Sequence, residues 1–379
     1  MGQFDFKIQD ESFTLPDKYS ELSDFKVDSV PRPYKVAWWD EDPAQIINRE
    51  MADAAGNVLV IDEKLRQLFS AAFGFSPERI FSLVADEEHK ILDTAAALFD
   101  FLQARGFSKS DRLIVVGGGV TQDVGGFVGG IYKRGLNWVF YPTTLLSMCD
   151  SCIGAKAGLN FKGVKNQLAI FSAPREVVVN PQFLKTLNER EFHSGLGEIL
   201  KLHVTGGGGL LENYQKIVAD GIVKDFTGYK SLIFGSLFVK KAVIEKDEFE
   251  QGLRKSLNYG HTFGHAIETL TGYNIPHGQA VAAGMIIVNQ LAHERGLLRA
   301  DKNLLMQNLC LKLLDAPTRR KIKCLSGDNF LELLRQDKKA SSGRINLVFL
   351  KDLGETIFVN YEINKDLSKS VDKVITSIF

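Results

Sequence analysis

Short hydrophobic stretches alternate with longer amphipathic ones through the first half of the chain. The short stretches are rich in β-branched and aromatic residues, which are typical of strands in buried sheets. Residues 91–105 place apolar side chains at steps of three and four, and Gly106 follows as a helix stop. Strands that alternate with helices predict an α/β fold with a largely parallel sheet. The predicted strands span residues 34–39, 57–62, 79–85, 112–119, 137–142 and 176–180.

The pattern changes to long helical segments from about Thr186 onward. Residues 189–204, 231–248 and 278–296 all carry helical periodicity. One hairpin pattern interrupts this series at residues 344–359, where two apolar stretches flank the turn KDLG. The tetraglycine Gly206–Gly209 predicts a mobile loop, since four glycines are too flexible for the inside of a helix. We therefore expect a domain boundary near residue 185, with a mostly α-helical second domain.

Length and composition agree with a two-domain globular enzyme. The 379 residues exceed the usual size of one core, and 45% of them are hydrophobic. The 46 basic residues balance the 46 acidic ones, so no overall field attracts nucleic acid or an anionic membrane. No apolar run reaches the roughly 18 residues that span a bilayer, and the N-terminal sequence lacks the order of a signal peptide. These features predict a cytoplasmic protein.

Four scattered cysteines fit a reducing compartment rather than a disulfide framework. Cys149 and Cys152 form a CxxC pair, which could be redox-active or half of a zinc site. A packing role is favoured, because the chain has no second CxxC.

Three glycines follow the strand predicted at residues 112–116. Gly117, Gly118 and Gly119 would let the backbone approach a diphosphate at the start of the next helix. The dinucleotide fingerprint GxGxxG fails, however, because its last position holds Gln122. Nucleotide binding and a tight turn for close helix packing both stay open here.

Residues 133–167 gather lysines and asparagines among small residues. Lysine supplies positive charge, and asparagine both donates to and accepts from hydroxyl groups. The stretch suits a sugar phosphate, although a solvated loop would explain isolated lysines equally well.

Three of the seven histidines, His261, His265 and His277, fall within seventeen residues. His261 and His265 are four residues apart, so they share one helical face and could grip one divalent ion. Glu198 is one candidate for an acidic third ligand. Histidines elsewhere in the chain are expected at the surface or in the core.

Together these residues resemble a known family, the sugar phosphate cyclases of the dehydroquinate synthase type. The similarity covers roughly Asp62 to Lys339. Its ordered motifs are GGGVTQD (117–123), YKRG (132–135), PTTLL (142–146), Asp150 and Lys156 as D-x5-K, KN (165–166), GEILK (197–201), the segment 247–268 and HGQAVAAGM (277–285).

The resemblance implies a Rossmann-like NAD-binding domain over residues 1–185 and an α-helical domain over residues 186–379. The second domain would hold zinc or cobalt, with substrate in the cleft between the domains. The implied metal ligands are Glu198, His261 and His277, so His265 becomes a substrate-side residue. The implied NAD contacts are Asp62, Glu87, Lys90, Gly118, Gly119, Asp123, Thr143 and Thr144.

The resemblance also assigns residues to the sugar phosphate. The implied catalytic residues are Asp150, Lys156, Lys201, Lys240 and His265. Substrate contacts are implied for Asn166, Arg254 and Asn258, and Lys338 or Lys339 would lie at the phosphate. Arg134 would reach the phosphate of the neighbouring subunit, which implies a homodimer.

The cation at position 254 bears on the choice of substrate. Family members that take a carboxylated seven-carbon substrate need a cation for the carboxylate, and Arg254 with Asn258 provides one. This favours 3-deoxy-D-arabino-heptulosonate 7-phosphate, a substrate of the shikimate pathway of aromatic amino acid biosynthesis. Departures from the family motifs at residues 151–155, 169–171 and 186–191 keep open a cyclase for another substrate, such as sedoheptulose 7-phosphate.

Two other classes of protein remain as alternatives. One is an iron- or zinc-dependent alcohol dehydrogenase of related architecture, which would accumulate reduced nicotinamide. The other is a non-catalytic protein that binds metal or nucleotide.

Overall fold

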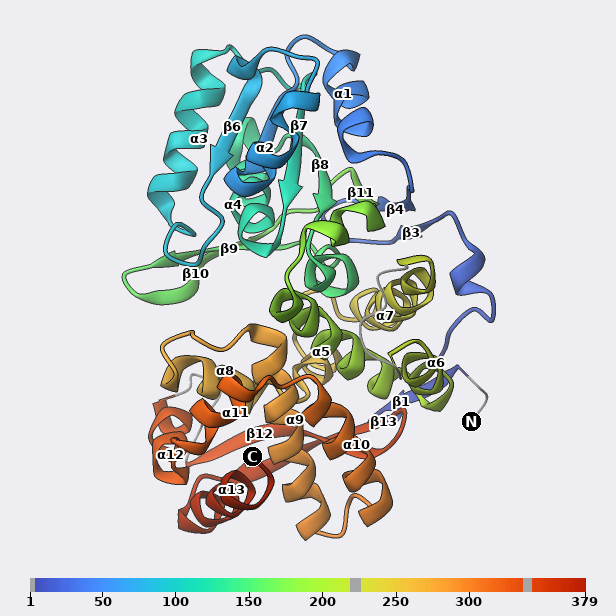
Figure 1. Ribbon diagram of the computed structural model, residues 1–379, viewed down its shortest axis with the longest axis vertical. Coiled ribbons are helices and arrows are strands. Elements are labelled where there is room, and N and C mark those ends of the chain that lie inside the picture. The colour runs from blue at the N-terminus through green and yellow to red at the C-terminus, as the bar shows by residue number, and fades with distance from the viewer. Residues whose placement is uncertain (1–3, 219–225, 337–342) are drawn as a thin grey trace. The chain divides into compact units, whose positions relative to one another are not determined.

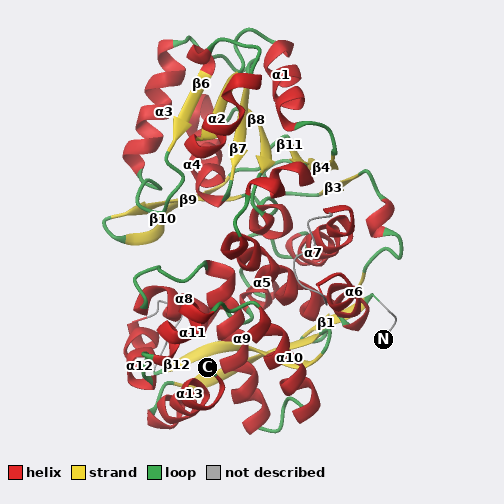
Figure 2. Ribbon diagram, in the orientation of Figure 1, coloured by secondary structure: helices red, strands yellow, loops and turns green. Residues whose placement is uncertain are grey.

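The computed structural model describes residues 4–218, 226–336 and 343–379, so Lys338 and Lys339 lie outside the described residues. The chain divides into two compact units. The sheet unit comprises the described residues of Ser20–Leu187 and Lys224–Lys230. The helical unit comprises the described residues of Met1–Tyr19, Asn188–Val223 and Ser231–Phe379. Figures 1 and 2 show the strands and helices of each unit.

The sheet unit is built on a seven-stranded sheet in the order β3-β4-β11-β8-β7-β5-β6. Neighbouring strands run parallel from β4 to β6, and the edge strand β3 is antiparallel to β4. The central strands are buried on both faces, which explains their continuous Val, Ile and Leu runs. The strands are β3 (Asp24–Val27), β4 (Tyr34–Trp38), β5 (Val58–Asp62), β6 (Ile80–Leu83), β7 (Arg112–Gly117), β8 (Asn137–Pro142) and β11 (Glu176–Val179).

Helices surround this sheet, as the sequence periodicity predicts (Figure 1). The helix expected over residues 91–105 is confirmed as α3, and Gly106 follows it with a φ of 63°. The α/β fold and all six predicted strands are also confirmed. The helices are α1 (Pro43–Asp53), α2 (Glu63–Phe69), α3 (Leu92–Ala104) and α4 (Gly119–Ile131).

A two-stranded hairpin, β9 (Lys156–Phe161) and β10 (Val164–Phe171), lies in the stretch that we interpreted as a loop. Lys162 and Gly163 form its turn, with φ angles of 49° and 79°. Two consecutive positive φ angles suit the right-handed twist of a hairpin. Polar and glycine residues break the alternation of the two strands, so hydrophobic pattern alone did not indicate them.

The helical unit also contains a four-stranded sheet, with its strands in the order β12-β13-β1-β2. The long helix α9 is buried along most of its length and contacts α5, α8, α10, α13 and β12. The strands are β1 (Asp5–Ile8), β2 (Glu11–Thr14), β12 (Arg344–Asp352) and β13 (Glu355–Glu362). The helices are α5 (Glu189–Gly206), α6 (Gly208–Val218), α7 (Tyr229–Ile244), α8 (His261–Leu270), α9 (His277–Glu294), α10 (Ala300–Lys312), α11 (Ala316–Lys323), α12 (Gly327–Gln336) and α13 (Lys365–Ile378).

The N-terminal segment differs from the sequence interpretation. We assigned residues 1–185 to one domain, but β1 pairs with β13, with Lys7 opposite Glu355. Residues 4–19 therefore belong to the helical unit. The late hairpin predicted at residues 344–359 is confirmed as β12 and β13, and its pairing with the N-terminal strand β1 could not be read from local pattern.

The tetraglycine does not form the mobile loop that we expected. Helix α5 continues through Gly206, and α6 begins at Gly208. Only Gly207 separates them. Its φ of 109° is one that glycine adopts easily, and it allows the sharp turn between the two helices. No helix among the described residues is long and apolar enough to cross a membrane.

Candidate functional site

Ligand-type side chains from three helices converge in the helical unit. Glu198 lies on α5, His261 and His265 lie on α8, and His277 is the first residue of α9. Ring nitrogens of the three histidines lie within 4.8 Å of one another. Glu198 Oε1 lies 3.3 Å from His277 Nε2 and 3.7 Å from His261 Nε2. A carboxylate grouped with imidazoles is a donor set that suits a divalent ion such as zinc.

Close helix packing at two glycines makes this convergence possible. A Cβ atom at Gly197 would lie 2.2 Å from the carbonyl oxygen of Gly278. A Cβ atom at Gly278 would lie 1.8 Å from the carbonyl oxygen of Ser194, whose hydroxyl accepts the Gly278 amide at 3.0 Å. Each glycine neighbours a ligand-type residue, Glu198 or His277. A larger side chain at either position would force α5 and α9 apart.

Neighbouring charges shift the pKa values of His261 and His277 in opposite directions. Burial and the positive charge of Lys201 lower the pKa of His261 well below its usual value. Burial also lowers the pKa of His277, but hydrogen bonds to Glu198 and Glu268 outweigh it and raise that pKa to about 10. His261 is thus neutral and able to donate a lone pair. His277 lies where two carboxylates favour a positive charge, which a metal ion could supply in place of the proton.

Glu268 is a member of this site that the sequence analysis missed. Its Oε2 lies 3.1 Å from Nδ1 of His277, and its side chain is largely buried. A carboxylate behind a ligating imidazole fixes the orientation of the ring and increases its basicity. The signal was present in the sequence, because Glu268 lies seven residues after His261 on the same helical face.

A buried lysine completes the charge pattern next to Glu198. Lys201 Nζ lies 2.5 Å from Glu198 Oε2, and the two side chains are only 2% and 1% exposed. Because both lie one turn apart on α5, the GEILK motif places a cation directly beside the carboxylate. Lys240, on α7, is also buried in this unit.

Arg254 and Asn258 lie in a 3₁₀ turn, Leu253–Asn258, that directly precedes α8. The Asp247 carboxylate accepts the backbone amides of Gln251, Gly252 and Arg254 at 2.8–2.9 Å. The Arg254 guanidinium is buried and donates to the carbonyl oxygen of Glu248. Arg254 is therefore held in one orientation before any ligand arrives.

The residues expected to bind nucleotide follow neighbouring strands of the sheet unit. Asp62 ends β5, Gly118 and Gly119 follow β7, and Thr143 and Thr144 follow β8. Since β5, β7 and β8 are adjacent and parallel, these residues share the carboxyl edge of the sheet. Gly119 begins α4, and an added Cβ there would meet nothing within 4 Å. Open backbone at a helix N-terminus suits a diphosphate.

Three further residues predicted to contact nucleotide hold the β9–β10 hairpin in place. Lys90 Nζ lies 2.6 Å from Asp123 Oδ2 and donates to Asn166 Oδ1 at 2.6 Å. Asp123 Oδ1 also accepts the Gly158 amide at 2.9 Å, and Glu87 Oε1 accepts the side chain of Asn160 at 2.8 Å. These contacts fix the hairpin that carries Lys156 and Asn166.

The remaining predicted residues also lie in the sheet unit. Asp150 belongs to a π-helical turn, Ser147–Ser151, and Lys156 opens β9 with an exposed side chain. Arg134 is exposed after α4, with a φ of 63°. The Cys149 and Cys152 thiols are buried and donate to the carbonyl oxygens of Leu146 and Met148 at 3.5 Å, which supports a packing role.

Comparisons with known proteins agree with this architecture. The family model for the 3-dehydroquinate synthase N-terminal domain matches residues 80–194, and the model for the C-terminal domain matches residues 195–340. A 3-dehydroquinate synthase from Streptococcus pyogenes serotype M3 is 34% identical over 360 residues, which cover 92% of this chain and 97% of that protein. A 3-dehydroquinate synthase from Geobacter metallireducens is 37% identical over 303 residues, which cover 80% of this chain and 82% of that protein.

Solved structures share the fold. A 2-deoxy-scyllo-inosose synthase superposes with a TM-score of 0.75 at 20% identity, covering 92% of this chain and 99% of that one. The 2-epi-5-epi-valiolone synthase ValA from Streptomyces hygroscopicus gives 0.75 at 24% identity, covering 93% and 99%. The fold is thus that of the sugar phosphate cyclases. The chain belongs to the 3-dehydroquinate synthase family of enzymes, as its motifs predicted.

Proposed function

We propose that this enzyme converts 3-deoxy-D-arabino-heptulosonate 7-phosphate to 3-dehydroquinate and releases phosphate. It would thus be a carbon–oxygen lyase of the shikimate pathway. The observation that carries the substrate assignment is the buried, pre-oriented Arg254 in the turn before the helix of His261. A fixed guanidinium suits a substrate carboxylate, which sedoheptulose 7-phosphate does not carry.

Glu198, His261 and His277 are proposed to hold a divalent metal, either zinc or cobalt. The neutral imidazole of His261 and the imidazole of His277 both lie close to the buried Glu198 carboxylate, an arrangement that fits such an ion. When bound, the metal would supply a Lewis acid that makes a coordinated substrate hydroxyl easier to deprotonate. Related structures bind NAD+ with Co2+ in a 2-deoxy-scyllo-inosose synthase and with Zn2+ in ValA.

NAD is proposed to bind at the carboxyl edge of the sheet unit, where it would accept a hydride from the substrate and later return it. Gly118 and Gly119 would admit the diphosphate to the amides of α4, and Asp62, Thr143 and Thr144 would hold the rest of the cofactor. Glu87, Lys90 and Asp123 would act by fixing the hairpin, in addition to any contact of their own.

The chain's own side chains would govern the phosphate and the carboxylate of the substrate. Lys156, Lys240 and a lysine at 338 or 339 would stabilise the charge that develops on the leaving phosphate. Arg254 and Asn258 would hold the carboxylate, and Asn166, Asp150, Lys201 and His265 would orient hydroxyl groups. Because the hydride would return to the substrate, the substrate would undergo no net oxidation and NAD would be regenerated.

A cytoplasmic homodimer completes the proposal. Arg134 is exposed and has a left-handed backbone conformation in the turn that follows α4. In the dimer it would bind the phosphate in the neighbouring subunit.

Phosphate release from a panel of sugar phosphates tests the assignment. We expect turnover of the carboxylated heptulosonate, little turnover of sedoheptulose 7-phosphate, and no accumulation of reduced nicotinamide. Arg254→Ala should lower kcat/KM for the carboxylated substrate about 100-fold, since a charge-assisted hydrogen bond contributes about 1.5–3 kcal/mol.

The neighbouring substitution Lys255→Ala, at an exposed position, serves as the matched control and should change little. A preference for sedoheptulose 7-phosphate would instead identify the enzyme as a specialised cyclase. Net formation of reduced nicotinamide would identify a dehydrogenase.

A further inference from the structure

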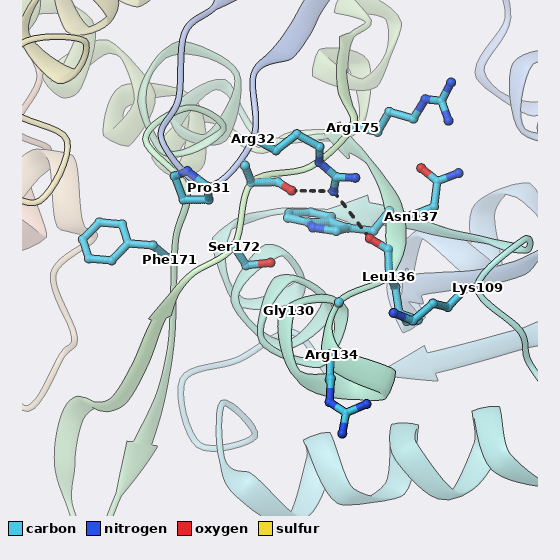
Figure 3. Close-up of a pocket in the computed structure, with 14 residues that line it drawn as sticks. Pro31, Arg32, Lys109, Gly130, Arg134, Leu136, Asn137, Phe171, Ser172 and Arg175 are labelled. Atoms are coloured by element: carbon cyan, nitrogen blue, oxygen red, sulfur yellow. Dashed lines mark hydrogen bonds between the residues drawn. The ribbon is translucent and has the colours of Figure 1, made fainter.

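A pocket lies at the amino ends of the strands of the seven-stranded sheet, opposite the proposed nucleotide residues. Its lining residues precede or begin β4, β7, β8 and β11, so it lies at the amino edge of the strands. The proposed nucleotide residues lie at the carboxyl ends of β5, β7 and β8. The pocket has a volume of about 630 Å³, which is within the range of small-molecule sites. Figure 3 shows its lining side chains.

Positive charge dominates the lining of this pocket. Arg32, Lys109, Arg134 and Arg175 contribute to it, and no Asp or Glu is among the described residues that line it. Burial and the charge of Arg175 together lower the pKa of Arg32. Cations that line one pocket with no carboxylate among them create a potential that favours an anion.

The walls also hold polar atoms that lack hydrogen-bond partners within the described parts of the chain. These atoms are Arg32 Nε, Trp138 Nε1 and Asn137 Oδ1. The Trp138 side chain is only 2% exposed, so its N–H group cannot form a hydrogen bond with bulk water instead. Buried polar groups without partners reduce stability, and an anion close to the Arg32 and Trp138 N–H groups would offset part of that loss.

The guanidinium of Arg32 is fixed from its other side. Its Nη2 donates to the carbonyl oxygen of Ala173 at 3.0 Å and to that of Leu136 at 3.4 Å (Figure 3). Two backbone anchors set the orientation of the planar group, so Nε is held in place at the wall. Figure 3 also shows that the Arg134 side chain points away from Arg32 and Ser172, which leaves it available for the intersubunit role proposed above.

We propose that this pocket binds a small phosphorylated metabolite at a site separate from the catalytic one. Arg32, Lys109 and Arg175 would neutralise the phosphate, and the buried indole of Trp138 beside Arg32 would respond to the charge that arrives. A phosphate monoester carries about −1.5 to −2 charges at neutral pH, which matches several cations better than a single carboxylate does. Asn137 and Ser172 would pair with hydroxyl groups of the same ligand.

Side-chain NMR of tryptophan in the full-length protein tests this proposal directly. The chain has three tryptophans, so its indole N–H region is simple and Trp138→Phe assigns the signal of Trp138. Inorganic phosphate and glycerol 3-phosphate should shift this signal in a saturable manner, whereas acetate, a single carboxylate, should shift it far less at the same concentration. Arg32→Gln and Arg175→Gln should each weaken binding about tenfold or more, as expected for loss of one charge-assisted contact.

Two control variants make the result specific. Lys26→Gln removes an exposed cation of the same unit outside the pocket and should leave the affinity unchanged. Lys156→Ala removes a lysine proposed to bind the substrate phosphate and should also leave the Trp138 titration unchanged. An indole signal that does not respond to phosphate, a preference for acetate, or equal losses in Lys26→Gln or Lys156→Ala would each overturn the proposal.

Discussion

The histidine cluster shows how strongly neighbours define the chemistry of a side chain. His261 and His277 are the same residue type a few ångströms apart, yet Lys201 opposes a positive charge on the first while Glu198 and Glu268 favour one on the second. The sequence spacing identified the helical face of His261 and His265. It could not show that Glu198 and His277, from two other helices, would meet that face.

Asp247 should make a pH-dependent contribution to stability. Burial raises the pKa of its carboxyl group, but hydrogen bonds from the backbone amides of Arg254, Gly252 and Gln251 outweigh it and lower the pKa. The folded value is thus below the unfolded one of about 3.9. The contribution is complete at neutral pH and is lost as the pH falls below about 4, through the folded pKa.

We therefore expect Asp247→Asn to reduce the free energy of unfolding by about 1–2 kcal/mol at pH 7. Urea unfolding from pH 7 down to pH 3 should show this difference narrowing in acid. Asp10→Asn, at an exposed position, is the control. A difference that stays constant over the whole range would contradict the assigned role of the carboxylate.

Helices α5 and α9 position the cluster by packing backbone against backbone. Gly197→Ala and Gly278→Ala should each destabilise the protein by more than about 2 kcal/mol, because the added Cβ would clash with a carbonyl oxygen. Both should also reduce bound zinc, measured by mass spectrometry after dialysis, since Glu198 and His277 would separate.

Gly208→Ala is the matched substitution, because a Cβ atom at that helical position meets nothing within 4 Å. It should leave stability and metal content close to those of the parent protein. Full zinc content in a folded Gly278→Ala variant would show that the close helix contact is not required.

The hairpin β9–β10 illustrates a limit of sequence pattern for single elements. Its strands carry Gly158, Asn160 and Asn166, which are poor strand residues by composition. Tertiary hydrogen bonds stabilise the hairpin where strand preference is weak, because Lys90, Asp123 and Glu87 bind these positions from distant segments. Residues expected to contact nucleotide therefore also have a structural role.

The homodimer is best tested with mixed dimers. If Arg134 serves the neighbouring subunit, then a dimer of Arg134→Ala with His277→Ala contains one complete site. Random pairing of equal amounts should recover about a quarter of the parent activity, although each variant alone is nearly inactive. Phosphate release after subunit exchange measures this recovery, and its absence would place Arg134 in its own subunit's site.

The spacing of hydrophobic residues, the turn residues and the ordered motifs were sufficient to predict the parallel sheet, the helical second half and the family. These features are local or nearly so, and each restricts the backbone where it occurs. The contacts that pair β1 with β13, place His277 beside Glu198, and gather cations around Trp138 join segments far apart in the chain. Such contacts form only when helices and strands pack, because no local pattern records which distant side chains a folded backbone brings within bonding distance.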